Sequence, residues 1–314
     1  MTVNQTAPAV TRPRRGEASP SAVPKPTRKR KKSPYPYWFY LPAVVIYATL
    51  FLLPTFASFF FSLTRWTIFN ATFIGVGNFV QFFQEPALVT GLRNTIIYAV
   101  MTSGLKVVLG MLFGVLLTSK IIARGFLRSV LFFPVLLSSI GVGIMFSVFM
   151  DPDKGLINQV LAAVGIQGPA WLADPTWAIY SVGLVDVWKG VGLATVIYIA
   201  GIVSIPAEYY EAAEMDGASS AKRFWNITVP LARPATATVI ILSLIGGLRS
   251  FDLIWAMTQG GPGFASDVIA SVIYKQYQAG FYGLSTAGNV VLFVIITAIV
   301  LPLSIFLNRK EVEQ

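Results

Sequence analysis

The polar residues best placed to handle a polar solute lie inside long apolar stretches. They are Lys106, Asp186, Lys189, Arg249, Asp252 and Asn289. A charge inside a membrane-spanning segment is costly, so it usually faces a partner or a water-filled cavity. Asp186 and Lys189 are three residues apart, as are Arg249 and Asp252, so each pair would share a helix face and could neutralise itself. Such pairs either fix helix packing or border a path for the solute.

The chain lacks residue types on which much catalytic chemistry depends. It has neither cysteine nor histidine, which removes thiolate and imidazole metal ligands and the usual general base near neutral pH. It also lacks the Gly-x-x-x-x-Gly-Lys-Ser/Thr phosphate loop, so it cannot bind ATP in that manner. We therefore expect no catalytic residue, no metal site and no cofactor on this chain, which is not itself an enzyme.

A polar segment, residues 205–234, lies between two long apolar stretches and has the pattern of a binding element. Pro206 favours the start of a helix. Asp216-Gly217 predicts a turn, because glycine enters the left-handed region at little steric cost. A second short helix is expected to follow and to end before Pro230. Two short helices joined at a glycine elbow suit insertion into a groove on another protein.

The elements that must position these residues are membrane-spanning helices. The chain is 55% hydrophobic and 12% charged, whereas a typical soluble domain is about 25% charged. About 20 apolar residues are enough to cross a bilayer as a helix. We expect an all-α integral membrane protein, a six-span helical bundle formed by residues 34–314. Its spans are predicted at about 37–64, 94–119, 129–150, 177–204, 235–258 and 284–307.

The distribution of charge orients this bundle. Nine of the 24 basic residues lie in the tail, residues 1–33. We expect this tail to be disordered, because it has almost no large apolar side chains to bury. Six spans place the other basic clusters on the same side as the tail, and the positive-inside pattern makes that side cytoplasmic, including residues 205–234. The tail is expected to touch membrane lipid. It lacks the folded basic domain of a nucleic-acid binder, so no nucleic acid is expected.

The polar segment resembles the signature loop of the permease subunits of bacterial ABC importers. That signature is Glu-Ala-Ala, three residues, Gly, nine residues, and Ile-x-Leu-Pro, with Val229 here in place of the leucine. The resemblance implies the ABC importer permease fold and a contact between this coupling loop and an ATPase subunit. The residues expected at that contact are Glu211, Ala212, Ala213, Asp216, Gly217, Ile227 and Pro230.

Further stretches are similar to those of carbohydrate importer permeases. Residues 258–262 look like the Thr-x-Gly-Gly-Pro stretch of that group, and Asn94-Thr95 and Trp171-Leu172 recur in it. The likeness extends from about residue 40 to the end of the chain. Within the group the chain resembles the first of two unlike permeases, the maltose- and glycerol-phosphate-type member. Its ending, residues 308–311, lacks the Gly-Ala-x-Lys-Gly typical of the second permease.

The resemblance implies a permease of an ATP-driven importer for an oligosaccharide or related sugar. It places the chain in the bacterial cytoplasmic membrane as a multi-pass protein with both termini in the cytoplasm. The implied partners are a second homologous permease that completes a heterodimer, two ATPase subunits that hold ATP and magnesium, and an extracytoplasmic solute-binding protein. Stacking aromatic side chains suit a sugar, and Trp188, Phe251 and Trp255 lie near the charged residues of the spans.

Two alternatives remain on the residues alone. An ion-coupled secondary carrier would use intramembrane Asp186 and Asp252, and a non-transporting membrane scaffold or receptor would use neither. Such a carrier needs no Glu-Ala-Ala loop. Replacing Glu211 and Gly217 therefore separates these hypotheses: the importer would lose transport with its fold intact, and the carrier would keep its uptake.

Overall fold

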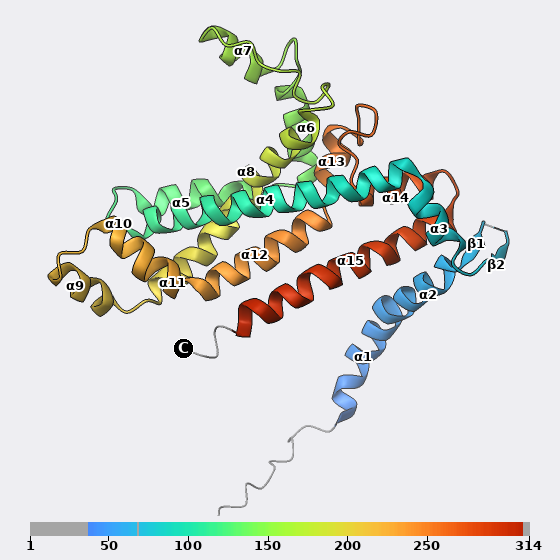
Figure 1. Ribbon diagram of the computed structural model, residues 1–314, viewed down its shortest axis with the longest axis horizontal. Coiled ribbons are helices and arrows are strands. Elements are labelled where there is room, and N and C mark those ends of the chain that lie inside the picture. The colour runs from blue at the N-terminus through green and yellow to red at the C-terminus, as the bar shows by residue number, and fades with distance from the viewer. Residues whose placement is uncertain (1–36, 68, 310–314) are drawn as a thin grey trace, which may run out of the picture. The chain divides into compact units, whose positions relative to one another are not determined.

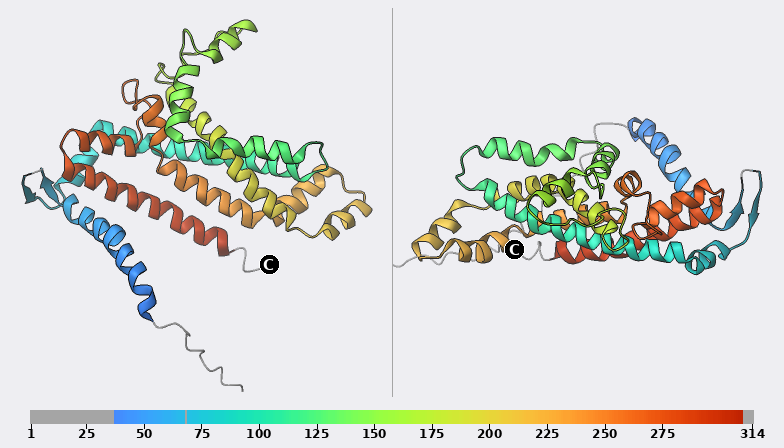
Figure 2. Two further views of the ribbon diagram at one scale, coloured as in Figure 1. Left: turned by 180° about the vertical axis from the view of Figure 1, so that it is seen from behind. Right: turned by 90° about the horizontal axis from the view of Figure 1, so that it is seen from above.

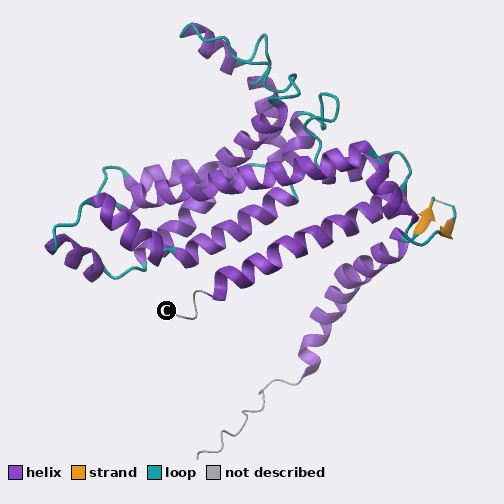
Figure 3. Cartoon of the chain, in the orientation of Figure 1, coloured by secondary structure: helices purple, strands orange, loops and turns teal. Residues whose placement is uncertain are grey.

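The computed structural model of the protein describes residues 37–67 and 69–309 (Figure 1). The expected basic tail, residues 1–33, lies outside the described residues, as do residues 310–314. The regular elements of the described part are helices apart from one antiparallel strand pair, β1 (Thr64–Trp66) and β2 (Ala71–Phe73), which Figure 3 shows in orange. The expected all-α class of membrane protein is confirmed, with one small strand pair added to it.

The helices fall into two units, residues 1–48 and 49–314. The described part of the first unit is a 3-10 turn, Tyr37–Tyr40, and α1 (Leu41–Tyr47), which buries none of its side chains. A π-helical turn, Ala48–Leu52, leads into the second unit. There the helices are α2 (Leu53–Ser62), α3 (Gly77–Gln84), α4 (Pro86–Thr118), α5 (Arg124–Phe132), α6 (Ser139–Phe149), α7 (Leu156–Ala163), α8 (Ala178–Val203), α9 (Ala207–Met215), α10 (Ser220–Arg223), α11 (Val229–Leu231), α12 (Arg233–Leu248), α13 (Asp252–Met257), α14 (Ile269–Gln278) and α15 (Tyr282–Arg309).

Four helices among the described residues are long and apolar enough to cross a membrane. They are Trp38–Ser62, Pro86–Thr118, Ala178–Val203 and Tyr282–Leu307. Two further pairs of helices pass the same test together although each pair is bent, which allows up to six spans. They are Arg124–Leu136 with Ser139–Phe149, and Ser220–Leu231 with Arg233–Leu248. The largest difference in bounds among the four is at α4, which begins at Pro86 instead of near Asn94.

The third and fifth expected spans are not single helices. The third is divided between α5, a 3-10 turn over Phe133–Leu136, and α6, with a bend of 98°. Pro134 lies at the start of that 3-10 turn, where its missing N–H ends the α-helical hydrogen-bond pattern. The fifth breaks after α12 ends at Leu248, and α13 begins at Asp252. Two glycines precede this break, and each weakens a helix by about 0.5–1 kcal/mol relative to alanine.

Helix α4 packs against both α8 and α12, and α12 also packs against α15. The left view of Figure 2 shows α12 between α4 and α15, in agreement with these contacts. Gly110 and Gly114 let α4 approach α8 closely, because a Cβ atom on Gly110 would lie 2.8 Å from the Cβ atom of Ala194. Small residues four apart are a common device for packing helices in membranes.

Adjacent glycines of α12 provide a matched test of this close packing. A Cβ atom on Gly247 would lie 2.7 Å from the Cα atom of Ala99 in α4, whereas one on Gly246 would meet nothing within 4 Å. We expect Gly247→Ala to lower the free energy of unfolding by about 1–3 kcal/mol through overpacking. Gly246→Ala should leave it unchanged or raise it by up to about 1 kcal/mol. Thermal unfolding of the two variants in detergent measures the difference, and equal melting temperatures would contradict the packing described here.

Candidate functional site

Residues 207–231 form a polar hairpin of two helical arms. The first arm is α9, which begins after Pro206 with Glu208 in its first turn. Gly217 has φ of +73°, in the left-handed region. Its N–H donates to the carbonyl of Glu214 at 3.0 Å, and the N–H of Ala218 donates to the carbonyl of Ala213 at 2.8 Å. The structure therefore has the expected first helix and the expected glycine turn.

The second arm differs from the sequence prediction. It runs continuously over Ser220–Leu231 and so passes through Pro230, although the helix was expected to end before that residue. The residues before the proline, Phe224–Thr228, are π-helical. A π-helical turn shifts the hydrogen bonds to i→i+5 and accommodates a residue that has no N–H to donate. This arm begins after the capping residue Ser219, so Ala218, which directly follows the glycine turn, is not part of it.

Two side-chain contacts join the arms to each other. The hydroxyl groups of Tyr210 and Thr228 are 3.0 Å apart, and Arg223 Nη1 is 3.0 Å from Glu214 Oε2. The Glu214 side chain is 71% exposed, so this ion pair contributes at most about 1 kcal/mol. The contacts fix the angle between the arms more than they stabilise the fold.

The outer surface of the hairpin carries most of the residues expected to contact an ATPase. Glu211, Ala212, Asp216 and Gly217 are exposed, and Ala213, Ile227 and Pro230 are half-buried. Met215 is 89% exposed and Trp225 66%, so these large apolar side chains lie on a surface that none of the described elements covers. Phe224 differs, because it packs inward against the buried cluster that includes Tyr198. A cavity of about 690 Å³ separates the hairpin from the ends of α4 and α8.

The polar residues of the spans make one ion pair, between α4 and α8. Lys106 Nζ lies 2.7 Å from Asp186 Oδ2. The expected neutralisation of Asp186 by Lys189 is therefore wrong: the closer cation comes from another helix, and Gly190 leaves the space for it, since a Cβ atom there would lie 2.7 Å from Lys106 Cε. A contact between helices is not visible in the spacing of one helix.

Arg249 and Asp252 do not pair either. Both are exposed, and the ion pairs found among the described residues are Lys106–Asp186, Arg223–Glu214 and Lys275–Asp267. The break between α12 and α13 separates the two residues, so they do not share the face of one helix. Asp252 instead lies in the first turn of α13, where a carboxylate interacts favourably with the helix dipole.

Two further polar groups, Tyr98 and Thr102, lie along α4 beside Lys106, and sequence reasoning missed them. Tyr98, Thr102 and Lys106 are four residues apart and buried, so they form a polar stripe on one helix face. The Thr102 hydroxyl group has no hydrogen-bond partner among the described residues, whereas the Tyr98 hydroxyl group lies beside Asp186 and Ser250. A buried hydroxyl group without a partner is costly, so the position of Thr102 needs a reason such as bound water or ligand. The four-residue spacing of polar side chains in an apolar helix was the signal that could have revealed them.

Asn289 lies apart from the ion pair, at a second cavity. This cavity of about 300 Å³ is lined by Phe251, Ala270, Ile273, Tyr274, Tyr277, Ser285 and Asn289. The rings of Phe251 and Trp255 are stacked 5.6 Å apart beside it. Trp188, also expected near the solute path, instead contacts Phe146 at 5.2 Å. Apart from Lys106 and Asp186, the structure places no two of the expected path residues in an ion pair.

A buried carboxylate lies where α14 packs against α4. Asp267 is completely buried and accepts hydrogen bonds from Ser271 Oγ and Lys275 Nζ, both at 2.7 Å. Asn94 Nδ2 donates to the Asp267 carbonyl at 2.9 Å, and the Ile269 N–H donates to Thr95 Oγ1 at 2.8 Å. The Gly-Gly-Pro stretch lies against the same carboxylate, since a side chain on Gly260 would overlap it. These motif residues therefore hold α14 against α4.

Comparison with known proteins agrees with this architecture. Residues 106–309 match the family described as "binding-protein-dependent transport system inner membrane component". The probable ABC transporter permease protein YurN of Bacillus subtilis (strain 168) is 34% identical over 284 residues, covering 88% of this chain and 97% of that protein. The trehalose/maltose transport system permease protein MalF of Thermococcus litoralis is 30% identical over 270 residues, covering 85% and 92%.

A solved structure supports the fold independently. A chain of a bacterial ABC transporter involved in the import of the acidic polysaccharide alginate superposes with a TM-score of 0.77 at 23% identity, covering 87% of this chain and 94% of that one. The family and these relatives favour the importer over an ion-coupled carrier or a non-transporting scaffold. The chain therefore belongs to the family of binding-protein-dependent transport system inner membrane components, as a permease subunit of the carbohydrate ABC importer type.

Proposed function

We propose that this permease couples ATP hydrolysis in a separate ATPase subunit to sugar import through its polar hairpin. The observation that carries the proposal is the continuity of the hairpin with two packed helices. Its first arm follows α8 directly, and its second arm enters α12 through a 67° bend. Both helices pack against α4 beside the polar stripe. A displacement of the hairpin would therefore move α8 and α12 as rigid bodies, as in other rigid-body switches.

The hairpin suits a groove on the ATPase. Glu211 would pair or hydrogen-bond with that surface, the alanines would allow close approach, and Gly217 would keep the elbow narrow. The exposed side chains of Met215 and Trp225 would supply apolar contact area. ATP and magnesium would be held by two ATPase subunits, and this chain would carry no catalytic residue, metal or cofactor.

The rest of the assembly follows from the same proposal. A second homologous permease would complete a heterodimer in the bacterial cytoplasmic membrane, with both termini of this chain in the cytoplasm, as the charge distribution favours. An extracytoplasmic binding protein would deliver the sugar. Support for this partner comes from an alginate ABC transporter whose structure includes an alginate pentasaccharide-bound periplasmic protein.

We further propose that the sugar passes between the polar stripe and the aromatic cavity, which is the cavity of about 300 Å³ lined in part by Phe251, Tyr274, Tyr277 and Asn289. Lys106, Asp186, Lys189, Arg249, Asp252 and Asn289 would border this path. Support comes from the unpaired buried hydroxyl group of Thr102 and from a small cavity of about 120 Å³ lined in part by Lys106, Gly190 and Ser243. Polar groups of this kind exchange hydrogen bonds with sugar hydroxyl groups at modest net cost.

Uptake by the complete importer in proteoliposomes tests this proposal. The probes are maltose, maltotriose, trehalose and arabinotriose, each radiolabelled and supplied with the binding protein. We expect uptake of at least one probe to require ATP and magnesium on the side of the ATPase and to be unaffected by collapsing proton and sodium gradients. Uptake that follows an ion gradient without ATP would establish the carrier instead.

A further inference from the structure

Seven aromatic rings form a continuous chain across five elements, which are α2, β1, α15, α14 and α13. Successive ring centroids are 4.1 Å apart for Phe61 and Trp66, 5.4 Å for Trp66 and Tyr282, and 5.3 Å for Tyr282 and Tyr277. The chain continues from Tyr277 to Tyr274 at 6.5 Å, and Tyr274 contacts the stacked pair of Phe251 and Trp255 at 5.3 and 4.9 Å. It therefore leads from α2 and the strand pair, through the start of α15 and α14, to the aromatic cavity.

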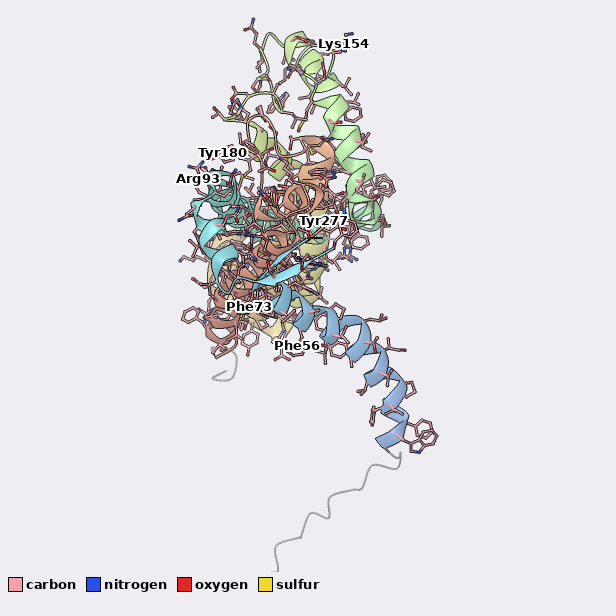
Figure 4. All side chains as sticks on the ribbon, turned by 90° about the vertical axis from the view of Figure 1, so that its right-hand side faces the viewer. Phe56, Phe73, Arg93, Lys154, Tyr180 and Tyr277 are labelled. Atoms are coloured by element: carbon pink, nitrogen blue, oxygen red, sulfur yellow. The ribbon has the colours of Figure 1, made fainter. Side chains whose placement is uncertain are left out.

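These rings are not part of the hydrophobic core. Tyr277 is 55% exposed and Tyr274 37%, whereas the core rings of Phe82, Tyr98 and Tyr198 are completely buried. Trp66, Tyr282 and Phe251 are half-buried. Figure 4 labels both Tyr277 and Tyr180. Tyr180 is also an exposed tyrosine, but it makes no ring contact among the described residues. The partly exposed side chains of Tyr274 and Tyr277 therefore leave surface that a ligand can contact.

The chain of rings ends where polar groups join it. Asn289 and Ser285 line the cavity beside Tyr274 and Tyr277. Its volume of about 300 Å³ is at the lower limit of the range of about 300–1,000 Å³ that ligand pockets occupy. A pyranose or furanose ring has apolar C–H faces and hydroxyl groups around its edge. Aromatic faces bind the former, and tyrosine hydroxyl groups and an amide bind the latter.

We propose that Phe61, Trp66, Tyr282, Tyr277 and Tyr274 form a sugar-binding track that hands a linear oligosaccharide, ring by ring, to the cavity beside Asn289. This inference rests on the proposed function, which puts the C-terminus in the cytoplasm and therefore the start of α15 at the opposite face of the membrane. It adds a site that the polar stripe does not include. Adjacent rings are close enough for a sugar leaving one ring to contact the next already. The track should thus favour oligosaccharides over shorter sugars.

Ring removal and ring conservation at two positions test the track in the complete importer. Tyr277→Leu and Trp66→Leu remove a ring but keep an apolar side chain, whereas Tyr277→Phe and Trp66→Phe keep a ring. Tyr180→Leu is the matched control outside the chain of rings. Uptake of maltose, maltotriose, trehalose and arabinotriose into proteoliposomes gives KM and the maximal rate, and sugar-independent ATPase activity reports an intact complex.

We expect each Leu variant to raise the KM for the trisaccharide that is taken up by roughly 3- to 10-fold, the range that an aromatic contact supports. The effect on a disaccharide should be smaller, and the Phe and Tyr180→Leu variants should resemble the wild type. Unchanged KM in the Leu variants, or equal losses in the Leu and Phe variants, would overturn the track while leaving the importer in place. Absence of ATP-dependent uptake of every probe by the wild type would instead overturn the proposed function and this inference with it.

Discussion

Gly217→Val is expected to lower ATP-driven sugar uptake by roughly 5- to 30-fold while the membrane helices stay folded. Gly217 has φ of +73°, and a Cβ atom there would meet nothing within 4 Å, so only the backbone conformation is disturbed. A residue with a side chain loses about 1–2 kcal/mol in the left-handed region, which corresponds to the stated factor in the population of the native elbow. The elbow would open and the two arms would no longer seat together.

Gly165→Val is the matched control. Gly165 has φ of +79° and equally open surroundings, but it lies in the loop after α7, away from the hairpin. Both substitutions place valine in the left-handed region at a similar cost in free energy. A difference in uptake therefore reports where the glycine lies in the fold, and not the backbone strain itself. Initial uptake rates and ATPase rates of both variants in proteoliposomes are the measurement. Equal uptake by the two variants would refute a special role for the elbow.

Removing one partner of the Lys106–Asp186 pair is expected to have the largest effect on stability. Asp186→Leu leaves the buried ammonium group of Lys106 without its partner at 2.7 Å. Breaking a fully buried pair costs about 3–5 kcal/mol, and we expect the lower end of that range here because the Asp186 side chain is 20% exposed. The double variant Lys106→Met/Asp186→Leu removes both charges, and its free energy of unfolding should return close to that of the wild type. Thermal unfolding of Lys106→Met, Asp186→Leu and the double variant measures the coupling between the two charges.

The double variant also separates packing from transport. If the pair borders the sugar path, the double variant should fold like the wild type and still transport slowly, because the polar groups are gone. Lys189→Met serves as the control, since Lys189 makes no ion pair among the described residues, and it should change stability little. Wild-type uptake by the double variant would show that the pair fixes helix packing only.

Local features were predictable from the sequence where neighbouring residues determine them. The helix after Pro206 and the turn at Gly217 follow from the backbone preferences of proline and glycine. The long helices follow from the length of the apolar stretches in the sequence. Helix α8 starts and ends within one residue of the predicted bounds, 177–204. By contrast, Pro230 lies inside a helix because the preceding turn is π-helical, and residue preferences do not predict such a turn.

Contacts between distant segments were not predictable. The partner of Asp186 lies on another helix, 80 residues away in sequence, and the i,i+3 spacing pointed to the wrong cation. The break near Arg249 divides a stretch that remains apolar on both sides, so hydropathy alone indicates one span. Asp267 was missed because its burial depends on α4 and the Gly-Gly-Pro stretch folding around it. Each of these features is created by tertiary packing, which one sequence does not specify.

Cysteine crosslinking from the hairpin tests the central claim most directly. The chain has no native cysteine, so Met215→Cys provides a single thiol at a side chain that is 89% exposed. Val164→Cys, at a side chain that is 68% exposed in the loop expected outside the membrane, is the control. We predict that a short bifunctional reagent joins the cysteine at position 215 to the ATPase subunit in membranes, and that the cysteine at position 164 gives no such product. A cysteine at position 215 that never reaches the ATPase, or that reacts with a membrane-impermeant maleimide added outside intact cells, would contradict the account.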